Sequence, residues 1–324
     1  MDYFRDIQGQ DEAVSQLNQG LTGANINHAY LFMGPPGVGK MPAALAFARG
    51  ILNLSDDDAD RYWGENVHPD LFLLEKKDNR SGIGKEQITK ELEPWLSFKP
   101  YRSRHRVAVI RDGQTMTPEA ANALLKTLEE PAPSAVIILL ADENSLLETI
   151  ISRCRIIKFS ALSERHIVDF LLKEDVAPEQ ARQAAVMGQG SLAYALVCVQ
   201  AENLGEKINS VTESIQAMNG KNQSQVFKLA EYLDKEPELF GLILGTVLRD
   251  MCVYLRTGNA ELLAEPGCAG LMDQCLGLNF ENLMTAVKQI YQLKRYYRRN
   301  INSYILSLNM SWAVYEGVSP DNRN

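Results

Sequence analysis

The sequence predicts an α/β domain with a doubly wound parallel sheet, followed by domains built only of helices. Three observations lead to this prediction. Short apolar runs recur before residue 160, a glycine-rich loop separates the first of them from a helix, and the strand pattern stops at about residue 161. The runs are nearly continuous in apolar residues, as in strands buried on both faces of a sheet. They lie at 30–33, 71–74, 107–110, 136–140 and 156–159.

The glycine-rich loop is the most informative feature of the chain. Its glycines let successive backbone N–H groups face one concavity, and the helix that follows adds the positive end of its dipole. The lysine of such a loop reaches the outer phosphates of a nucleotide. We therefore expect this loop to hold ATP or ADP. Its residues are Gly34, Pro35, Pro36, Gly37, Val38, Gly39, Lys40 and Met41.

The residue after the lysine departs from the motif. Active phosphate loops carry Ser or Thr there, and the hydroxyl ligates Mg²⁺. Met41 offers no hard oxygen ligand. The loop is thus suited to hold phosphate but poorly equipped to hold the metal that hydrolysis needs.

Composition sets broad limits on location and partners. The chain has 324 residues, of which 45% are hydrophobic and 23% charged, as in an ordinary globular protein. No apolar run approaches the ~20 residues of a membrane span, and the first residues do not form a signal peptide. The net charge of -8 argues against wholesale wrapping of nucleic acid. The five cysteines form no CxxC pair, which favours free thiols in the cytoplasm.

The helical segments define the expected domains. A helix over 117–130 is the clearest, since Thr117 can cap it, Pro118 fits its first position and Pro131 follows its end. Ser163 is a plausible cap for the next helical region. We expect a phosphate-loop domain over 1–160, a small helical lid over 161–205 and a helical collar over 206–324.

Several motifs together resemble those of bacterial clamp-loader subunits of the AAA+ class. The resemblance is clear from residue 4 to about 200 and weaker beyond. The most specific motifs are the run over 122–131 and Ser152-Arg153-Cys154, because phosphate loops alone occur in many families. The other matching segments are Ile7-Gln8-Gly9-Gln10, His28-Ala29-Tyr30-Leu31-Phe32, His68-Pro69-Asp70 and Asn300-Ile301-Asn302.

The resemblance implies that the chain's own ATPase site is degraded. In active relatives a carboxylate at the position of Asp112 helps to hold Mg²⁺, and a glutamate follows it to polarise the attacking water. Here Gly113 follows, and Asp112 can equally be a strand-end residue that caps a turn. A sensor is expected after the fourth strand, where the sequence reads Ala141-Asp142-Glu143-Asn144. The lid arginine expected after Gly190-Ser191 is also missing.

Arg153, in contrast, belongs to a motif that is intact in this chain. In the family, the arginine of the Ser-Arg-Cys motif is a finger that reaches the ATP of a neighbouring subunit. Its permanently charged guanidinium suits a developing phosphoryl charge. The alternative is a structural arginine in an ion pair. We expect Cys154 to be a small buried spacer rather than a nucleophile.

Two further expectations concern metal and nucleic acid. Relatives commonly carry a zinc module of cysteines before His-Pro-Asp, but residues 50–67 contain no cysteine, so we expect no zinc. Basic clusters over 99–106 and 294–299 contain aromatic residues and can bind nucleic acid. A solvated or subunit-facing surface is the more common role of such clusters.

Three functions remain open from the sequence. The first is a non-hydrolysing structural subunit of the clamp loader in the DNA polymerase III holoenzyme. It would act with the motor and delta subunits to load the sliding clamp onto primed DNA. The second is the ATP-hydrolysing motor subunit of the same loader. The third is a nucleotide-sensing regulatory module unrelated to replication.

Overall fold

The computed structural model describes residues 2–23, 26–56, 58–65, 68–77, 80–142, 146–218, 222–265, 270–271, 277–294, 296 and 302–319. The chain divides into two compact units, Met1–His166 and Ile167–Asn324. The first unit contains the sheet, and the described part of the second is helical. The further division of the second unit at residue 205 stays a prediction.

The first unit contains a parallel sheet in the order β2-β3-β4-β1-β5. Its five strands lie where the apolar runs predict them, to within one residue at most ends. In the register, Leu31 of β1 lies between Leu139 of β4 and Ile156 of β5. The strands are β1 (Ala29–Met33), β2 (Leu71–Leu74), β3 (Arg106–Ile110), β4 (Ala135–Ala141) and β5 (Arg155–Lys158).

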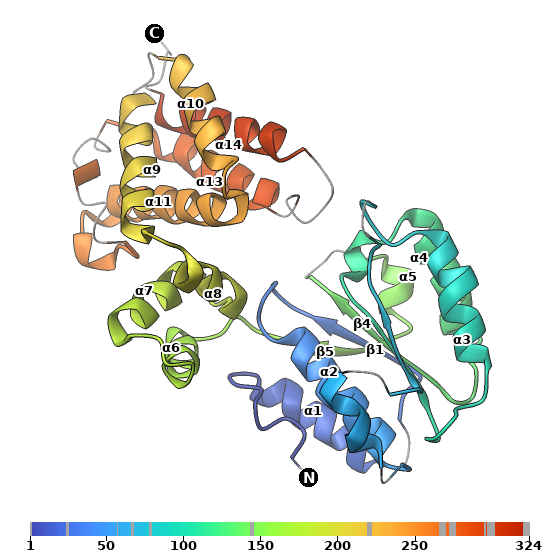
Figure 1. Cartoon of the computed structure of the whole chain (residues 1–324). Coiled ribbons are helices and arrows are strands. Elements are labelled where there is room, and N and C mark those ends of the chain that lie inside the picture. The colour runs from blue at the N-terminus through green and yellow to red at the C-terminus, as the bar shows by residue number, and fades with distance from the viewer. Residues whose placement is uncertain are drawn as a thin grey trace. The chain divides into compact units, whose positions relative to one another are not determined.

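Helices cover both faces of this sheet (Figure 1). Alternate residues of β1 point to opposite faces, so Tyr30 and Phe32 join one core and Ala29 and Leu31 the other. The first core packs against α1 (Asp11–Thr22), α2 (Lys40–Asn53) and part of the 3₁₀ segment η1 (Ala59–Glu65). The second packs against the π-helical turn η2 (Gln87–Leu92), α3 (Glu93–Ser97), α4 (Pro118–Glu129) and α5 (Glu148–Ile151).

The expectation that all five strands are buried on both faces is wrong for β5. This strand lies at the edge of the sheet, and Ile157 is its only buried residue. Arg155 is partly exposed, and Ile156 and Lys158 are exposed. An apolar pair such as Ile156-Ile157 does not reveal whether a further strand or helix will cover it, so composition alone could not identify the edge.

The predicted helix caps are present. The Thr117 hydroxyl accepts a hydrogen bond from the Ala120 N–H at 3.2 Å, at the start of α4. The Ser163 hydroxyl accepts one from the His166 N–H at 3.3 Å, at the start of α6 (Glu164–Lys173). Both caps satisfy a backbone donor that the first turn of a helix leaves unpaired.

The second unit is a set of packed helices. Within it α7 packs against α8, α11 against α13, and α14 against both α10 and α13. The long α11 is mostly buried, with Phe240 and Leu244 inside the core. Besides most of α6, the described helices of this unit are α7 (Pro178–Gly188), α8 (Leu192–Gln200), α9 (Leu204–Met218), α10 (Ser224–Leu233), α11 (Pro237–Thr257), η4 (Ala260–Leu262), α13 (Phe280–Lys294) and α14 (Ser303–Val318).

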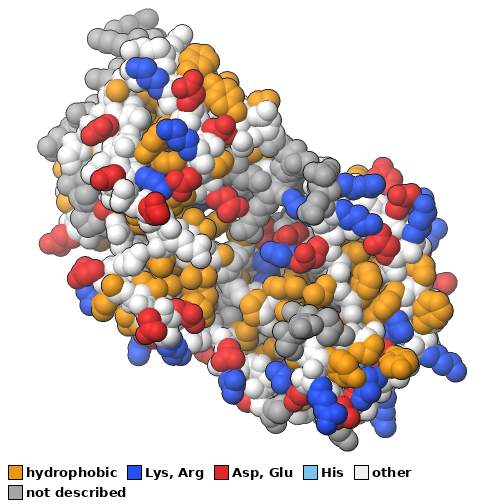
Figure 2. Space-filling view, in the orientation of Figure 1, with side chains coloured by type: hydrophobic (Ala, Val, Ile, Leu, Met, Phe, Trp, Pro, Cys, Tyr) orange, Lys and Arg blue, Asp and Glu red, His pale blue; other side chains and the backbone are white. Residues whose placement is uncertain are grey.

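The surface is of mixed charge. On the face that Figure 2 shows, basic side chains of the described residues are interspersed with acidic ones. Among these described residues, none of the helices has the length and apolar character that would let it cross a bilayer.

Candidate functional site

The phosphate loop connects β1 to α2 at the carboxyl end of the sheet's inner strand β1. Gly39 stands just before α2 with φ +98°, a backbone conformation that favours glycine. Gln10 fastens the loop from the start of α1. Its side-chain amide donates to the carbonyls of Val38 and Ser160 at 3.2 and 2.8 Å, and its oxygen accepts from the Ser160 N–H at 3.0 Å.

Lys40 is engaged within the chain. Its ammonium donates to the carbonyls of Gly34 and Pro35, the latter at 2.7 Å. It also forms an ion pair with Asp142, with Nζ 3.2 Å from Oδ1. Only 10% of the Lys40 side chain is exposed. The lysine that would meet the outer phosphates of a nucleotide therefore already faces a carboxylate.

Gln114 links that carboxylate to the end of β3. It lies in the 3₁₀ turn η3 (Gly113–Thr115) and donates to Asp142 Oδ2 at 3.2 Å and to Asp112 Oδ1 at 3.4 Å. Its own oxygen accepts from the Asp142 N–H at 3.3 Å. The Gln114 side chain thus contacts both the backbone N–H and the carboxylate of Asp142.

Asp112 stands in a turn, as the alternative interpretation of its position requires. It has φ +52°, and its carbonyl accepts from the N–H and the hydroxyl of Thr115, both at 2.8 Å. Gly113 is buried, and a Cβ built on it would lie 2.6 Å from Leu139 Cδ1 in the core. A side chain at this position would therefore require Leu139 to shift, and the water-activating glutamate of active relatives is absent here.

Met41 contributes packing. Its side chain lies against the core on the α1 and α2 face of the sheet. It therefore fills apolar space at the position where a Ser or Thr hydroxyl would serve a metal ion.

Arg153 follows the short helix α5. Its guanidinium forms an ion pair with Glu129 at the end of α4, with NH2 2.6 Å from Oε1, and donates to the Thr149 carbonyl at 2.9 Å. Both side chains are partly solvated, with 36% of Arg153 and 50% of Glu129 exposed. Exposed pairs of this kind contribute about 0–1 kcal/mol. The guanidinium thus lies near the surface, held by contacts whose loss would cost little free energy.

Cys154 is unsuited to act as a nucleophile. Burial raises the pKa of its thiol to about 11. The thiol therefore stays protonated at neutral pH, which fits the expected role of a small spacer.

The comparisons with known proteins agree with the motifs. Residues 9–163 match the family model described as DNA polymerase III, delta subunit. The delta' subunit of DNA polymerase III from Bacillus subtilis (strain 168) is 27% identical, over 95% of this chain and 97% of that protein.

The chain is similar in sequence to DNA polymerase III clamp-loader subunits.

Other relatives are longer than this chain. The tau/gamma subunit from Haemophilus influenzae is 30% identical over 86% of this chain, but the match spans only 40% of that protein. The gamma subunit from Buchnera aphidicola is 32% identical over 66% of this chain and 63% of its own length. Among the three, only the delta' relative is matched over nearly its whole length.

The segment predicted to form the lid lacks the arginine expected there. Ser191 caps α8 and accepts a hydrogen bond from the Tyr194 N–H at 3.3 Å. Leu192 is the first residue of that helix. The position expected to carry the arginine therefore has an apolar side chain.

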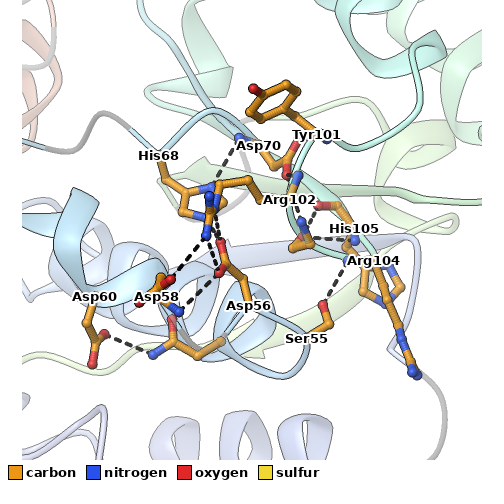
Figure 3. A network of polar contacts seen from close by, with 12 residues as sticks. Ser55, Asp56, Asp58, Asp60, His68, Asp70, Tyr101, Arg102, Arg104 and His105 are labelled. Atoms are coloured by element: carbon orange, nitrogen blue, oxygen red, sulfur yellow. Dashed lines mark hydrogen bonds and ion pairs between the residues drawn. The ribbon is translucent and has the colours of Figure 1, made fainter.

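A polar network occupies the segment in which clamp-loader relatives carry cysteines (Figure 3). Arg102 donates to both oxygens of Asp56 at 2.7 and 3.0 Å and holds the pKa of that carboxyl at about 2. His68 Nδ1 accepts from the Asp70 N–H at 3.1 Å, so its Nε2 donates to Asp56 at 3.3 Å. Trp63 stacks on the His68 ring, with centroids 6.5 Å apart.

Asp70 is the second centre of this network. Its carboxylate is fully buried and accepts three successive backbone N–H groups, from Tyr101, Arg102 and Ser103, at 2.7, 2.8 and 3.0 Å. Arg106 lies 3.8 Å from it. The Asp70 side chain thus ties the backbone of the loop before β3 to the start of β2.

We expect the purified protein to contain less than stoichiometric zinc. Among the described residues no three His, Cys, Asp or Glu side chains are grouped to hold a metal ion, and residues 50–67 contain no cysteine. Elemental analysis checks this expectation. A full equivalent of zinc that survives chelation would show that ligands lie elsewhere in the chain.

The basic clusters are only partly available to a ligand. In the first, Arg102 pairs with Asp56, and Arg106 donates to the Trp95 carbonyl at 2.9 Å and lies over the Trp95 ring. Lys99 and Arg104 are exposed. In the second, Lys294 lies against the rings of Tyr194 and Tyr291, and burial lowers its pKa to about 8. Arg295 and residues 297–301, which include Asn300 and Ile301, lie outside the described residues.

Sequence reasoning missed the roles of Gln114 and Gln10. Gln114 meets Asp142 across 28 positions of sequence, and Gln10 meets Ser160 across 150. Such pairings depend on which strands lie side by side, so no local pattern signals them. Glu143 and Asn144, which follow Asp142 in the expected sensor segment, lie outside the described residues.

Proposed function

We propose that the chain is a non-hydrolysing, delta'-type structural subunit of the DNA polymerase III clamp loader. In this role it works in the cytoplasm with the motor and delta subunits, and the complex loads the sliding clamp onto primed DNA. The observation that carries the proposal is the contrast within one domain between a disabled ATPase site and an intact Ser152-Arg153-Cys154 motif.

The chain's own ATPase site departs from that of an active enzyme at several independent positions. Lys40 faces Asp142, Met41 packs against the core, and Gly113 stands where a glutamate is expected. The loop N–H groups and Lys40 are the groups that would hold the phosphates of ATP or ADP. The hydroxyl that would complete the Mg²⁺ site is missing, so nucleotide would be bound without turnover.

Arg153 is the residue through which this subunit would contribute to hydrolysis. Once released from Glu129, its guanidinium would reach the ATP of a neighbouring subunit and stabilise the charge that develops in the transition state. Such fingers supplied in trans are worth about 10³–10⁵ in rate in GTPases. The helices after residue 206 would join the collar of the complex.

Two other functions remain as alternatives. A motor subunit of the same loader is disfavoured by Met41, Gly113 and the missing lid arginine. A regulatory nucleotide-sensing module would not assemble with the loader at all. Co-purification of the tagged chain with the motor and delta subunits distinguishes the regulatory module from both kinds of clamp-loader subunit.

We expect the isolated protein to show no ATP turnover above background. The water activator and the metal hydroxyl are both missing, so a bound nucleotide would have neither of the groups that start hydrolysis. Release of phosphate is measured for the wild-type protein and for Lys40→Ala under the same conditions. Turnover that Lys40→Ala abolishes would identify the chain as a motor subunit instead.

A further inference from the structure

We propose that Asp142 is an internal anion that holds the place of the terminal phosphate on Lys40, so that the phosphate loop selects nucleoside diphosphates over triphosphates. The inference rests on the proposed ability of this loop to bind nucleotide. It adds a specificity-determining residue that the sequence motif does not contain.

The first observation is the position of the ion pair. Met33 and Ala141 are register partners in β1 and β4, so Gly34 and Asp142 leave the sheet side by side, and the Gly34 N–H donates to the Ala141 carbonyl at 3.4 Å. Lys40 reaches back over this point. Its ammonium donates to the Gly34 and Pro35 carbonyls and to Asp142 Oδ1. A carboxylate oxygen therefore lies where Lys40 would otherwise meet an oxygen of phosphate.

The second observation is that Asp142 is held in this orientation. The Gln114 side chain forms a closed pair of hydrogen bonds with it, one to the Asp142 N–H and one to Oδ2, at 3.3 and 3.2 Å. This leaves Oδ1 directed to Lys40. The carboxylate also remains one-third exposed, so a bound anion would meet it from the solvent side.

The chemistry of the ligand decides the selectivity. The lysine of a phosphate loop contacts the β- and γ-phosphates. The γ-phosphate of a triphosphate would have to share Lys40 with the Asp142 carboxylate, and like charges at such distances repel. Met41 supplies no hydroxyl for a Mg²⁺ ion that would offset the repulsion. A diphosphate brings only its β-phosphate to Lys40, one anionic group fewer than a triphosphate, so it meets less repulsion from Asp142.

The test compares the binding of ATP and of ADP to Asp142→Asn and to the wild-type protein. We expect the substitution to raise the affinity for ATP about tenfold or more and the affinity for ADP less than about threefold, since the triphosphate brings an additional phosphate to the carboxylate. Binding is measured by titration of the full-length chain with fluorescent analogues of the two nucleotides. Asp142→Ala is measured alongside, because an asparagine oxygen can still accept from Lys40.

The control is Glu148→Gln, which removes one negative charge from an exposed position six residues along the same connection. It should change neither affinity. Circular dichroism and the thermal midpoint establish that each variant is folded.

An ATP affinity that is unchanged in both Asp142 variants overturns the proposal. So does an equal gain for ADP, or a failure of wild type and variants to bind either nucleotide. Assembly with the motor and delta subunits is measured separately on the complex, so each of these outcomes leaves the structural role in the loader intact. Conversely, a chain that does not assemble with the motor and delta subunits would refute the proposed function, and the nucleotide affinities would still test the selectivity.

Discussion

Replacing Asp70 with alanine is expected to lower the free energy of unfolding of the first unit by about 3–5 kcal/mol, the usual cost of removing one partner from a buried charged network. The fully buried carboxylate accepts three backbone N–H groups and neighbours Arg106. Alanine would leave these donors without an acceptor and a cation without its counter-charge.

Urea unfolding followed by tryptophan fluorescence measures this effect. Of the three tryptophans, Trp63 and Trp95 lie in the first unit and Trp312 in the second. Trp63 stacks on His68 and Trp95 lies under Arg106, so both report on the network itself. A Trp312→Phe background removes the signal of the second unit.

Asp60→Ala is the matched control for this prediction. Asp60 also accepts from an arginine, Arg49, at 2.8 Å, but both side chains are more than a third exposed. Its loss is expected to cost about 1 kcal/mol or less. If Asp70→Ala destabilises the first unit no more than Asp60→Ala does, the buried network does not hold this segment.

Replacing Arg153 with alanine is expected to reduce clamp loading by the reconstituted complex about tenfold or more, because one guanidinium would no longer stabilise the transition state at the neighbouring ATP. The variant should still fold and assemble. Its ion pair with Glu129 is solvated, so the free energy of unfolding should change by about 1 kcal/mol or less.

The variant Glu129→Gln distinguishes a role of Arg153 as a finger from a structural role in the ion pair. It breaks the same ion pair but leaves the guanidinium in place. If Arg153 acts on a neighbour, this variant should load clamps at close to the wild-type rate. If the ion pair itself were what matters, Glu129→Gln and Arg153→Ala would impair loading to the same extent.

The sequence predicts the local features of this protein well. Each strand, the phosphate loop and the cap at Thr117 follow from residues that are adjacent in the chain and that form the feature by themselves. The motif residues His68 and Asp70 are also visible in the sequence. Their role is not, because their partners Asp56 and Arg102 come from other segments.

The features that the sequence could not predict are all consequences of tertiary pairing. The Lys40–Asp142 ion pair depends on β1 lying next to β4, and the exposure of Ile156 depends on β5 forming the edge. The same holds for the crowding at Gly113, which comes from Leu139 of a different strand. A glycine in place of the glutamate is apparent from the sequence, but its close approach to Leu139 is not.

The rate of clamp loading by complexes that carry Lys40→Ala or Arg153→Ala distinguishes a structural subunit from a motor. We expect the Lys40 variant to load at the wild-type rate, since the chain's own site would perform no turnover, and the Arg153 variant to load about tenfold more slowly or worse. The opposite pattern, with loading lost in Lys40→Ala and kept in Arg153→Ala, would show that this subunit is a motor.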